Sequence, residues 1–202
     1  MSSFNDVKMV GEVVTEPALN TLLPCNCDLY HFRLSMLRHS GTADVVDVYT
    51  TKSEAVKVSK GMRVSIIGNM RSQDLQWETG KNRVVMYVYA EKVYTYNISP
   101  KDINNVCIAG FICAEPTMKT ITRGGKLTQI VLAVADNYFT CLAWDKDALW
   151  VSKMQVGAEI QIIGRLQSRP YTKSLENGDV IQRTAYEISA KQINEWLYED
   201  EI

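Results

Sequence analysis

Three aromatic residues in the C-terminal half of the sequence could stack on nucleic-acid bases, and the basic residues interspersed with them could contact phosphates. Sequence-tolerant binding of a single strand needs this combination, because every base has a flat face and each stacked base contributes about 1–3 kcal/mol. The aromatic residues are Tyr138, Trp144 and Tyr171, and the basic residues are Lys146, Arg165, Arg169, Lys173 and Arg183. The alternative is that the aromatic residues form part of the hydrophobic core.

The N-terminal half offers a weaker version of the same chemistry. If Tyr49 is aligned with Trp144, Ala43 lies opposite Tyr138, so one aromatic platform is missing. Acidic side chains that would repel phosphates stand nearby, namely Asp44, Asp47 and Asp74. We expect a weaker site that serves assembly more than binding. Its candidate residues are Tyr49, Lys52, Arg71, Trp77 and Lys81.

Catalytic and metal chemistry find little support in the sequence. His31 and His39 have no paired Ser or Cys context, and no phosphate loop or paired-carboxylate motif occurs. Cys25 and Cys27 with His31 could suggest zinc, but structural zinc sites usually have more widely spaced Cys pairs and a second pair elsewhere. We therefore expect no enzymatic activity, no metal and no cofactor.

Composition and charge are those of an ordinary soluble globular protein, with 46% apolar residues and a net charge of -1 in 202 residues. No apolar run approaches the roughly 18 residues that span a bilayer, and the first residues do not resemble a secretory signal. Residues 1–100 carry a net charge of +1, residues 101–194 carry +2, and residues 195–202 carry -4. We expect a cytoplasmic protein with reduced thiols, no membrane contact and an acidic tail.

The sequence contains two copies of one unit. Three segments recur in the same order with offsets of 99, 96 and 100 residues, which indicates a tandem repeat with a unit of about 95 residues. The matching segments are residues 7–17 with 106–116, 61–68 with 157–164, and 88–93 with 188–193.

Each unit has the element order of a known barrel. Short segments rich in Val, Ile and Tyr predict strands, and Gly or polar clusters between them predict turns. Good capping residues predict one helix in each unit, at residues 53–58 and 145–150. The order strand, strand, strand, helix, strand, strand is that of the OB-fold, a five-stranded Greek-key barrel. A plain six-stranded sandwich is the alternative.

We therefore expect an all-β chain, with one short helix per unit, that folds as two tandem OB-fold five-stranded barrels. The first barrel is expected at residues 1–96 and the second at residues 104–194. Residues 97–103 would form the linker, and residues 195–202 a short acidic tail.

Four segments of the second unit are more specific than these patterns, namely residues 104–110, 132–134, 141–144 and 164–171. Together they resemble the bacterial single-stranded DNA-binding protein family. In that family the first strand ends in Gly, the third ends in an aromatic residue, and the fourth runs into a turn like Gly-Arg-Leu-Gln. The resemblance covers residues 104–193 well and residues 5–93 more loosely, through the repeat.

The resemblance implies binding of single-stranded DNA in replication, recombination or repair. It places Tyr138, Trp144 and Tyr171 where the family carries its stacking aromatic residues. Two barrels per chain resemble the tandem form of the family, in which a homodimer supplies four barrels. The end of the chain, residues 198–202, looks like a short version of the acidic tail that recruits replication and repair proteins, without the long linker and the terminal Pro-Phe.

An interaction module of another class is the main alternative. OB-folds have many functions, so the fold alone does not select one. A primosome-type accessory protein would use the aromatic residues as a protein interface and bind DNA weakly or not at all.

Overall fold

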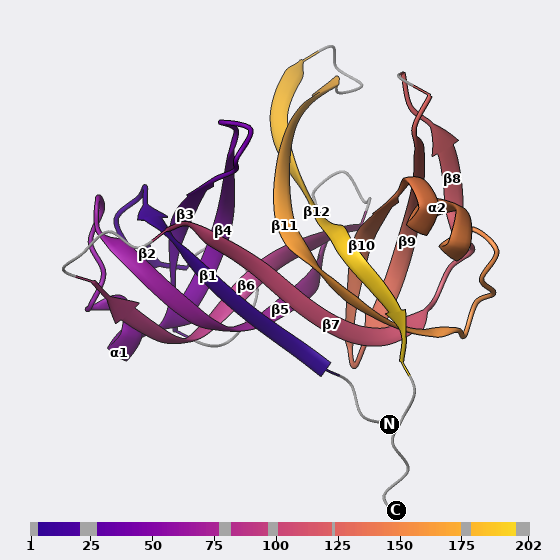
Figure 1. Cartoon of the computed structure of the whole chain (residues 1–202). Coiled ribbons are helices and arrows are strands. Elements are labelled where there is room, and N and C mark those ends of the chain that lie inside the picture. The colour runs from indigo at the N-terminus through magenta and orange to yellow at the C-terminus, as the bar shows by residue number, and fades with distance from the viewer. Residues whose placement is uncertain are drawn as a thin grey trace, which may run out of the picture.

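The computed structural model describes residues 4–20, 28–76, 82–96, 101–122, 124–174 and 179–196, without the side chains of residues 75, 76, 82, 83 and 173. The chain forms two similar halves joined side by side (Figure 1). The N-terminal half comprises β1 (Phe4–Val13), β2 (Ala18–Leu19), β3 (Leu29–Leu37), β4 (Ala43–Thr51), α1 (Lys52–Ala55), β5 (Arg63–Gln76) and β6 (Asn82–Thr95). The C-terminal half comprises β7 (Ile103–Ile112), β8 (Thr117–Thr120), β9 (Lys126–Val134), β10 (Asn137–Trp144), α2 (Asp145–Val151), β11 (Glu159–Ser174) and β12 (Val180–Glu195).

Each half closes into a barrel with the same connections. The strand order is β2-β3-β4-β6-β5-β1-β7-β11-β12-β10-β9-β8, so the second half repeats the first in mirrored order. Additional pairings of β1 with β3 and of β7 with β9 close a ring of five long strands in each half. The prediction of an all-β chain with tandem OB-fold barrels is confirmed. Among the described strands, the short β2 and β8 were not predicted.

The first helix is shorter than the predicted residues 53–58. After Ala55 the backbone N–H groups of Lys57 and Val58 donate to carbonyl groups three residues earlier, which is the tighter pattern of a 3₁₀ turn. Val58 is nevertheless buried in the core. Val58 therefore contributes to the core from a turn rather than from a helix.

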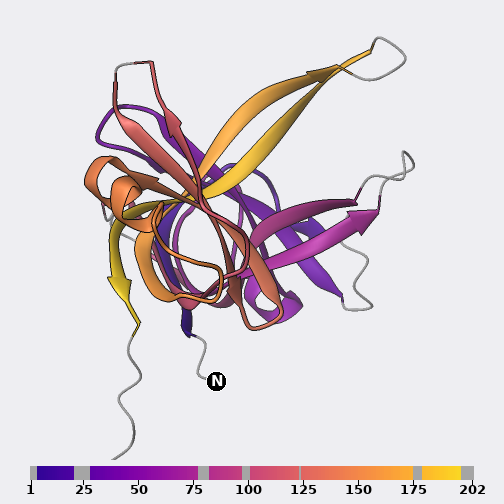
Figure 2. The same cartoon turned by 90° about the vertical axis from the view of Figure 1, so that its right-hand side faces the viewer.

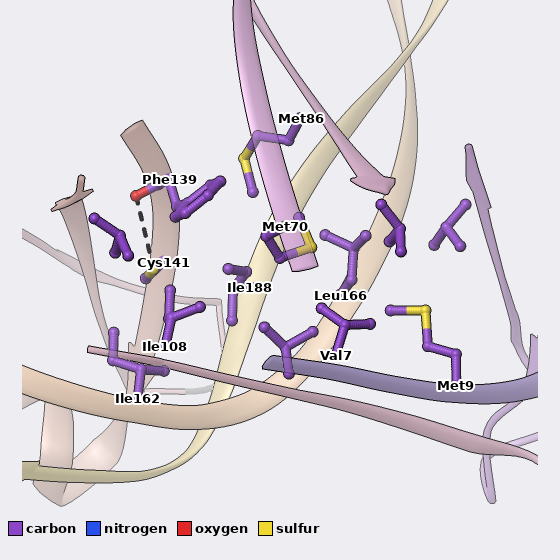
Figure 3. Packing of buried hydrophobic residues seen from close by; sticks show 14 of the residues in the cluster. Val7, Met9, Met70, Met86, Ile108, Phe139, Cys141, Ile162, Leu166 and Ile188 are labelled. Carbon is purple, nitrogen blue, oxygen red and sulfur yellow. Dashed lines mark hydrogen bonds between the residues drawn. The ribbon is translucent and has the colours of Figure 1, made fainter. Parts of the chain in front are cut away.

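The two barrels share one sheet and one core. β1 pairs with β7 antiparallel, and at the middle of this ladder Val7 lies opposite Val106, its equivalent in the repeat. An approximate two-fold axis between the halves therefore passes beside this pair. Buried apolar side chains of both halves form one continuous cluster, in which Val7, Met70 and Leu166 lie near one another (Figure 3).

The repeated glycines of the fourth long strand allow neighbouring strands to approach closely. β5 and β6 lose register beside Gly68, and β11 and β12 do so beside Gly164. A Cβ at Gly68 would stand 1.9 Å from the backbone oxygen of Tyr89, and one at Gly164 would stand 2.4 Å from that of Ser189. Any other residue would force these strands apart at the bulge.

Two long hairpins extend beyond the barrels. β5 with β6, and β11 with β12, project outward from the molecule (Figure 2). No helix in the described part of the chain is long and apolar enough to cross a membrane.

Candidate functional site

A groove on the C-terminal barrel combines an indole ring with cationic side chains. It encloses about 270 Å³ between β8, β9, β10, β11 and β12. Trp144 lies at the end of β10, while Lys119 and Arg169 reach the groove from β8 and β11. The other lining residues are Thr117, Leu127, Gln129, Leu142, Gln167 and Glu187.

Trp144 is held in place by the backbone and by one hydrogen bond. Its indole N–H donates to the Ser189 hydroxyl at 3.0 Å, which links β10 to β12. Its own backbone is extended, and the next residue, Asp145, has a φ of +48° at the start of α2. The side chain is half-buried, so part of the ring is available in the groove for stacking.

A second groove of about 230 Å³ contains Tyr171 and borders the first. Both grooves are lined by Gln129 and Glu187, so together they form one path across the C-terminal barrel. The second groove is also lined by residues 84–86 of β6, which belong to the other half. The path from Trp144 past Tyr171 therefore ends on the N-terminal barrel.

Cations follow this path, and Arg169 is paired with a carboxylate. Arg169 donates to the Glu187 carboxylate at 3.2 Å, and its side chain is largely exposed. Arg183 lies directly opposite Tyr171 in the β11–β12 ladder. Lys173 is on the same hairpin, but its side chain lies outside the described residues.

Neither groove is lined by Tyr138, Lys146 or Arg165, and Arg165 lines a separate pocket at the junction of the halves. Tyr138 is 51% exposed at the junction of the halves, where its backbone N–H donates to the Ser72 hydroxyl at 2.8 Å. Lys146 is exposed on α2 and lines neither groove.

Tyr49, the predicted platform of the N-terminal half, is covered by protein. It is only 3% exposed, and its ring lies 4.7 Å from His31 and 4.8 Å from Tyr87. Lys52 is exposed at the start of α1. Trp77 and Lys81 lie outside the described residues.

The alignment of Tyr49 with Trp144 is wrong by two residues. Val48 pairs with Val88 in the first half and Cys141 pairs with Ile188 in the second, so Val48 and Cys141 occupy equivalent places. By this register the equivalent of Trp144 is Thr51, and both residues immediately precede the helix of their half. The turn between β3 and β4 is longer than the turn between β9 and β10, which shifts the spacing.

The N-terminal half has a different aromatic surface, which the sequence patterns missed. The Arg71 guanidinium lies 4.0 Å from the centre of the Tyr89 ring, a cation–π contact. Arg71 and Tyr87 line a cavity of about 540 Å³ that also reaches Asn137 of the other half. Tyr87 and Tyr89 read in the sequence as ordinary alternating strand residues, so composition gave no signal for them.

Asp44 and Asp47 do not act as the exposed phosphate-repelling groups that we expected. Asp44 is 1% exposed and forms an ion pair with Arg38. The Nε atom of Arg165, from the other half, lies 3.9 Å from the Asp44 carboxylate. The backbone N–H of Ser168 also donates to it, at 3.1 Å. Hydrogen-bond donors and cations therefore surround its negative charge, and two of them, Arg165 and Ser168, come from the other half, so Asp44 links the two halves.

Asp47 makes the second charged link between the halves. It accepts hydrogen bonds from Tyr186 of β12 at 2.6 Å and from His31 at 2.9 Å, and Arg33 lies at 3.5 Å. Burial opposes ionisation of this carboxyl, but the bonds from His31 and Tyr186 outweigh it and lower its pKa. Burial and the Asp47 charge raise the pKa of Tyr186.

No group of three or more metal-ligating side chains occurs within the part of the chain that the structure describes. Cys25 and Cys27, which were weighed as zinc ligands, lie outside that part.

The C-terminal half matches one family model. Residues 103–195 match the model of the Single-strand binding protein family. Proteins of this family bind DNA and are not enzymes, in agreement with the prediction that the chain has no enzymatic activity. None of the curated proteins compared is significantly similar to the sequence.

Solved structures confirm the fold over the whole chain. The wild-type single-stranded DNA binding protein from Thermus aquaticus is 18% identical, with a TM-score of 0.76 over 100% of this chain and 97% of that one. A variant of the same protein gives the same identity and TM-score over 98% and 97%. The N-terminal domain of PriB from Thermoanaerobacter tencongensis covers 46% of this chain and 98% of its own, at 23% identity, but its TM-score of 0.37 is too low to support an argument.

Proposed function

Because residues 103–195 match the model of the Single-strand binding protein family, we propose that the chain binds single-stranded DNA without sequence specificity. The observation that carries the proposal is the path formed by the two adjoining grooves. It offers Trp144 and Tyr171 as stacking surfaces, with Lys119 and Arg169 beside them. Stacking tolerates any base, so binding that rests on these rings would not select a sequence.

A fluorescence titration tests this proposal. We expect oligo(dT) to quench the tryptophan emission, because a stacked base would contact Trp144, and we expect quenching to weaken as salt rises. A duplex of the same length should bind much more weakly. Equal affinity for the single strand and the duplex would overturn the proposal, and no quenching at low salt would favour the protein-interaction module instead.

We also propose that two chains assemble into a homodimer with four barrels. In β7, Val106 and Ile108 point into the core, so Cys107 between them faces the opposite side of the shared sheet. That face includes Lys8 of β1 and Ile67 of β5, and no element of the described chain covers it. A second copy stacked on this face would give a closed, symmetric assembly.

Light scattering tests the assembly directly. A homodimer has twice the 22.8 kDa mass of the chain, and a monomer at micromolar concentration would contradict the proposal. If the shared sheets stack face to face, Cys107 lies near the two-fold axis, so a short bismaleimide should link two chains. Cys107→Ser should abolish that link without changing the mass measured by light scattering.

We further propose separate roles for the two barrels and the acidic tail. Residues 1–96 and 104–194 would be the two barrel domains, and the protein would act in the cytoplasm in replication, recombination or repair. The acidic tail would recruit other proteins of these processes. Deleting residues 199–202 should then leave oligo(dT) binding intact while abolishing capture of such a partner, and loss of DNA binding on deletion would contradict this division of roles.

A further inference from the structure

A pocket at the junction of the halves is lined by more cationic side chains than carboxylates. It encloses about 390 Å³ between the end of β3, the turn that follows it, and strands β7, β11 and β12. Its charged and amide lining residues include Arg38, Asp44, Asp102, Asn104, Arg165 and Lys191.

Both carboxylates of the pocket already have cationic partners. Asp44 receives two hydrogen bonds from the Arg38 guanidinium. Asp102 is paired with Arg63 and also accepts the backbone N–H of Leu37 at 2.6 Å. The charges of Arg165 and Lys191 therefore remain as a surplus in the pocket.

Arg165 has an N–H group without an acceptor. Its Nε is buried and has no hydrogen-bond partner among the described residues, and the Asp44 carboxylate at 3.9 Å is too distant to accept from it. Burial, together with the nearby Arg38 guanidinium, lowers the pKa of Arg165. An anion in the pocket would supply the missing acceptor and offset the repulsion between the two guanidinium groups.

The equivalent place in the other half shows that the barrel does not require these cations. By the register of the repeat, Asn69 is the equivalent of Arg165, and Glu91 is the equivalent of Lys191. There the Asn69 amide donates to the Glu91 carboxylate at 2.8 Å, which makes a satisfied pair. The same backbone thus carries a neutral amide and a carboxylate on one side and two cations on the other.

The pocket lies next to the proposed DNA path along one strand. Arg165, Gln167 and Arg169 alternate on one face of β11, at a spacing of about 7 Å from each to the next. Gln167 and Arg169 line the Trp144 groove, and Arg165 donates to Gln167 at 3.4 Å. A strand that leaves the groove along β11 reaches the pocket next.

We propose that this junction pocket binds a phosphate group of the DNA strand, held by Arg165 and Lys191, as the strand passes from one half to the other. This inference rests on the proposed function. A planar guanidinium with a free N–H and a mobile ammonium group suit the tetrahedral oxygens of a phosphodiester.

The test compares Lys191→Gln with Lys60→Gln, which removes the same charge from an exposed position outside the site. Each protein is titrated with an oligo(dT) of about 35 nucleotides over a range of salt concentrations. Loss of one phosphate contact should lower the slope of log affinity against log salt by about 0.7 and weaken binding about fivefold at 0.1 M salt. Arg165→Lys, which keeps the charge and loses the planar N–H groups, should weaken binding as well, and Lys60→Gln should match the wild type.

The outcomes separate this inference from the proposed function. If the wild type binds oligo(dT) and Lys191→Gln retains the full slope, the pocket is not a phosphate site, while the proposed function stands. A wild type that does not bind oligo(dT) refutes the proposed function. In that case, thermal unfolding of both proteins with pyrophosphate at constant ionic strength tests the pocket by itself. If pyrophosphate raises the melting temperature of the wild type but not that of Lys191→Gln, the pocket is a site for a free phosphate compound. If pyrophosphate changes both melting temperatures equally, the pocket is not a phosphate site.

Discussion

Asp44 and Asn137 occupy equivalent places in the two halves, and each binds a serine of the opposite half in the same way. The Ser168 N–H donates to the Asp44 carboxylate, and the Ser72 N–H donates to the Asn137 side-chain oxygen. In return, each serine hydroxyl accepts the backbone N–H of the following residue, Val45 in one case and Tyr138 in the other. The hydrogen bonds are the same on both sides of the axis, but only one side carries a charge.

A second repeated pair shows the same conservation of hydrogen bonds without charge. The Asn5 side chain exchanges two bonds with the backbone of Met70, and the Asn104 side chain exchanges two with that of Leu166. These bonds lie within each half, whereas the serine bonds at Asp44 and Asn137 join the two halves. Ionic groups are concentrated around Asp44 and Asp47, where they fix the junction and leave the Arg165 pocket positive.

The largest expected effect is on stability. Asp44→Ala removes a buried carboxylate and leaves Arg38, Arg165 and the Ser168 N–H without it, so we expect a loss of about 3 kcal/mol in the free energy of unfolding. Asn137→Ala leaves only neutral groups unpaired and should cost about 1 kcal/mol. Urea unfolding monitored by circular dichroism measures both.

Asp44→Asn is the matched control for this pair. It keeps an acceptor for the Ser168 N–H and removes only the charge, so it should fall between the other two variants in stability. If Asp44→Ala and Asn137→Ala lower the free energy of unfolding equally, the charge of Asp44 does not contribute to stability beyond its hydrogen bonds.

The next effect distinguishes the two barrels as binding surfaces. Trp144→Ala should weaken oligo(dT) binding roughly five- to a hundredfold, because one stacked base contributes about 1–3 kcal/mol. Tyr49→Ala should leave affinity nearly unchanged, because that ring is covered by His31 and Tyr87. It should instead lower the melting temperature, since a large buried side chain is lost. Anisotropy with labelled oligo(dT) and a thermal scan measure the two effects.

Trp144→Phe controls for folding in this comparison. It keeps an aromatic face but loses the bond to Ser189, and it should retain most of the affinity. If Tyr49→Ala and Trp144→Ala weaken binding equally while both proteins stay folded, the two barrels are not unequal in the way proposed.

The smallest expected effect concerns acid. Interactions with His31 and Tyr186 lower the pKa of Asp47 in the folded protein, so they stabilise the fold above its unfolded pKa of about 4 and are lost as the pH falls through the folded value. As the pH is lowered from about 5, the free energy of unfolding should therefore fall less for Asp47→Asn than for the wild type. Across the axis, Thr140 is the equivalent of Asp47 and Met86 is the equivalent of Tyr186, and neither carries a charge.

Asp74→Asn provides the comparison, because Asp74 is an exposed carboxylate of the same half. Denaturant unfolding at a series of pH values gives the three profiles. An Asp47→Asn profile parallel to that of the wild type would show that the link to Tyr186 does not contribute to acid sensitivity.

The architecture could be predicted because its signals are local. Alternating apolar residues mark strands whatever their partners, and the recurrence of Gly68 as Gly164 reports a close approach of strands that both barrels require. The repeat therefore predicted two barrels, and the aromatic and basic residues of the C-terminal half included Trp144 and Arg169, which the fold brings into one groove.

Other features depend on contacts between residues far apart in the sequence. Asp47 and Tyr186 are separated by 139 positions, and Asp44 and Ser168 by 124, so composition alone suggested repulsion of phosphates where the fold makes links. The register of β4 against β6, which assigns Thr51 rather than Tyr49 as the equivalent of Trp144, is set by strand pairing after a turn of different length. The sequence by itself determined the strands and their repetition, because side-chain alternation is a local property. Only the tertiary structure decided which charges are neutralised and which rings are covered, because burial is set by neighbours that are distant in the sequence.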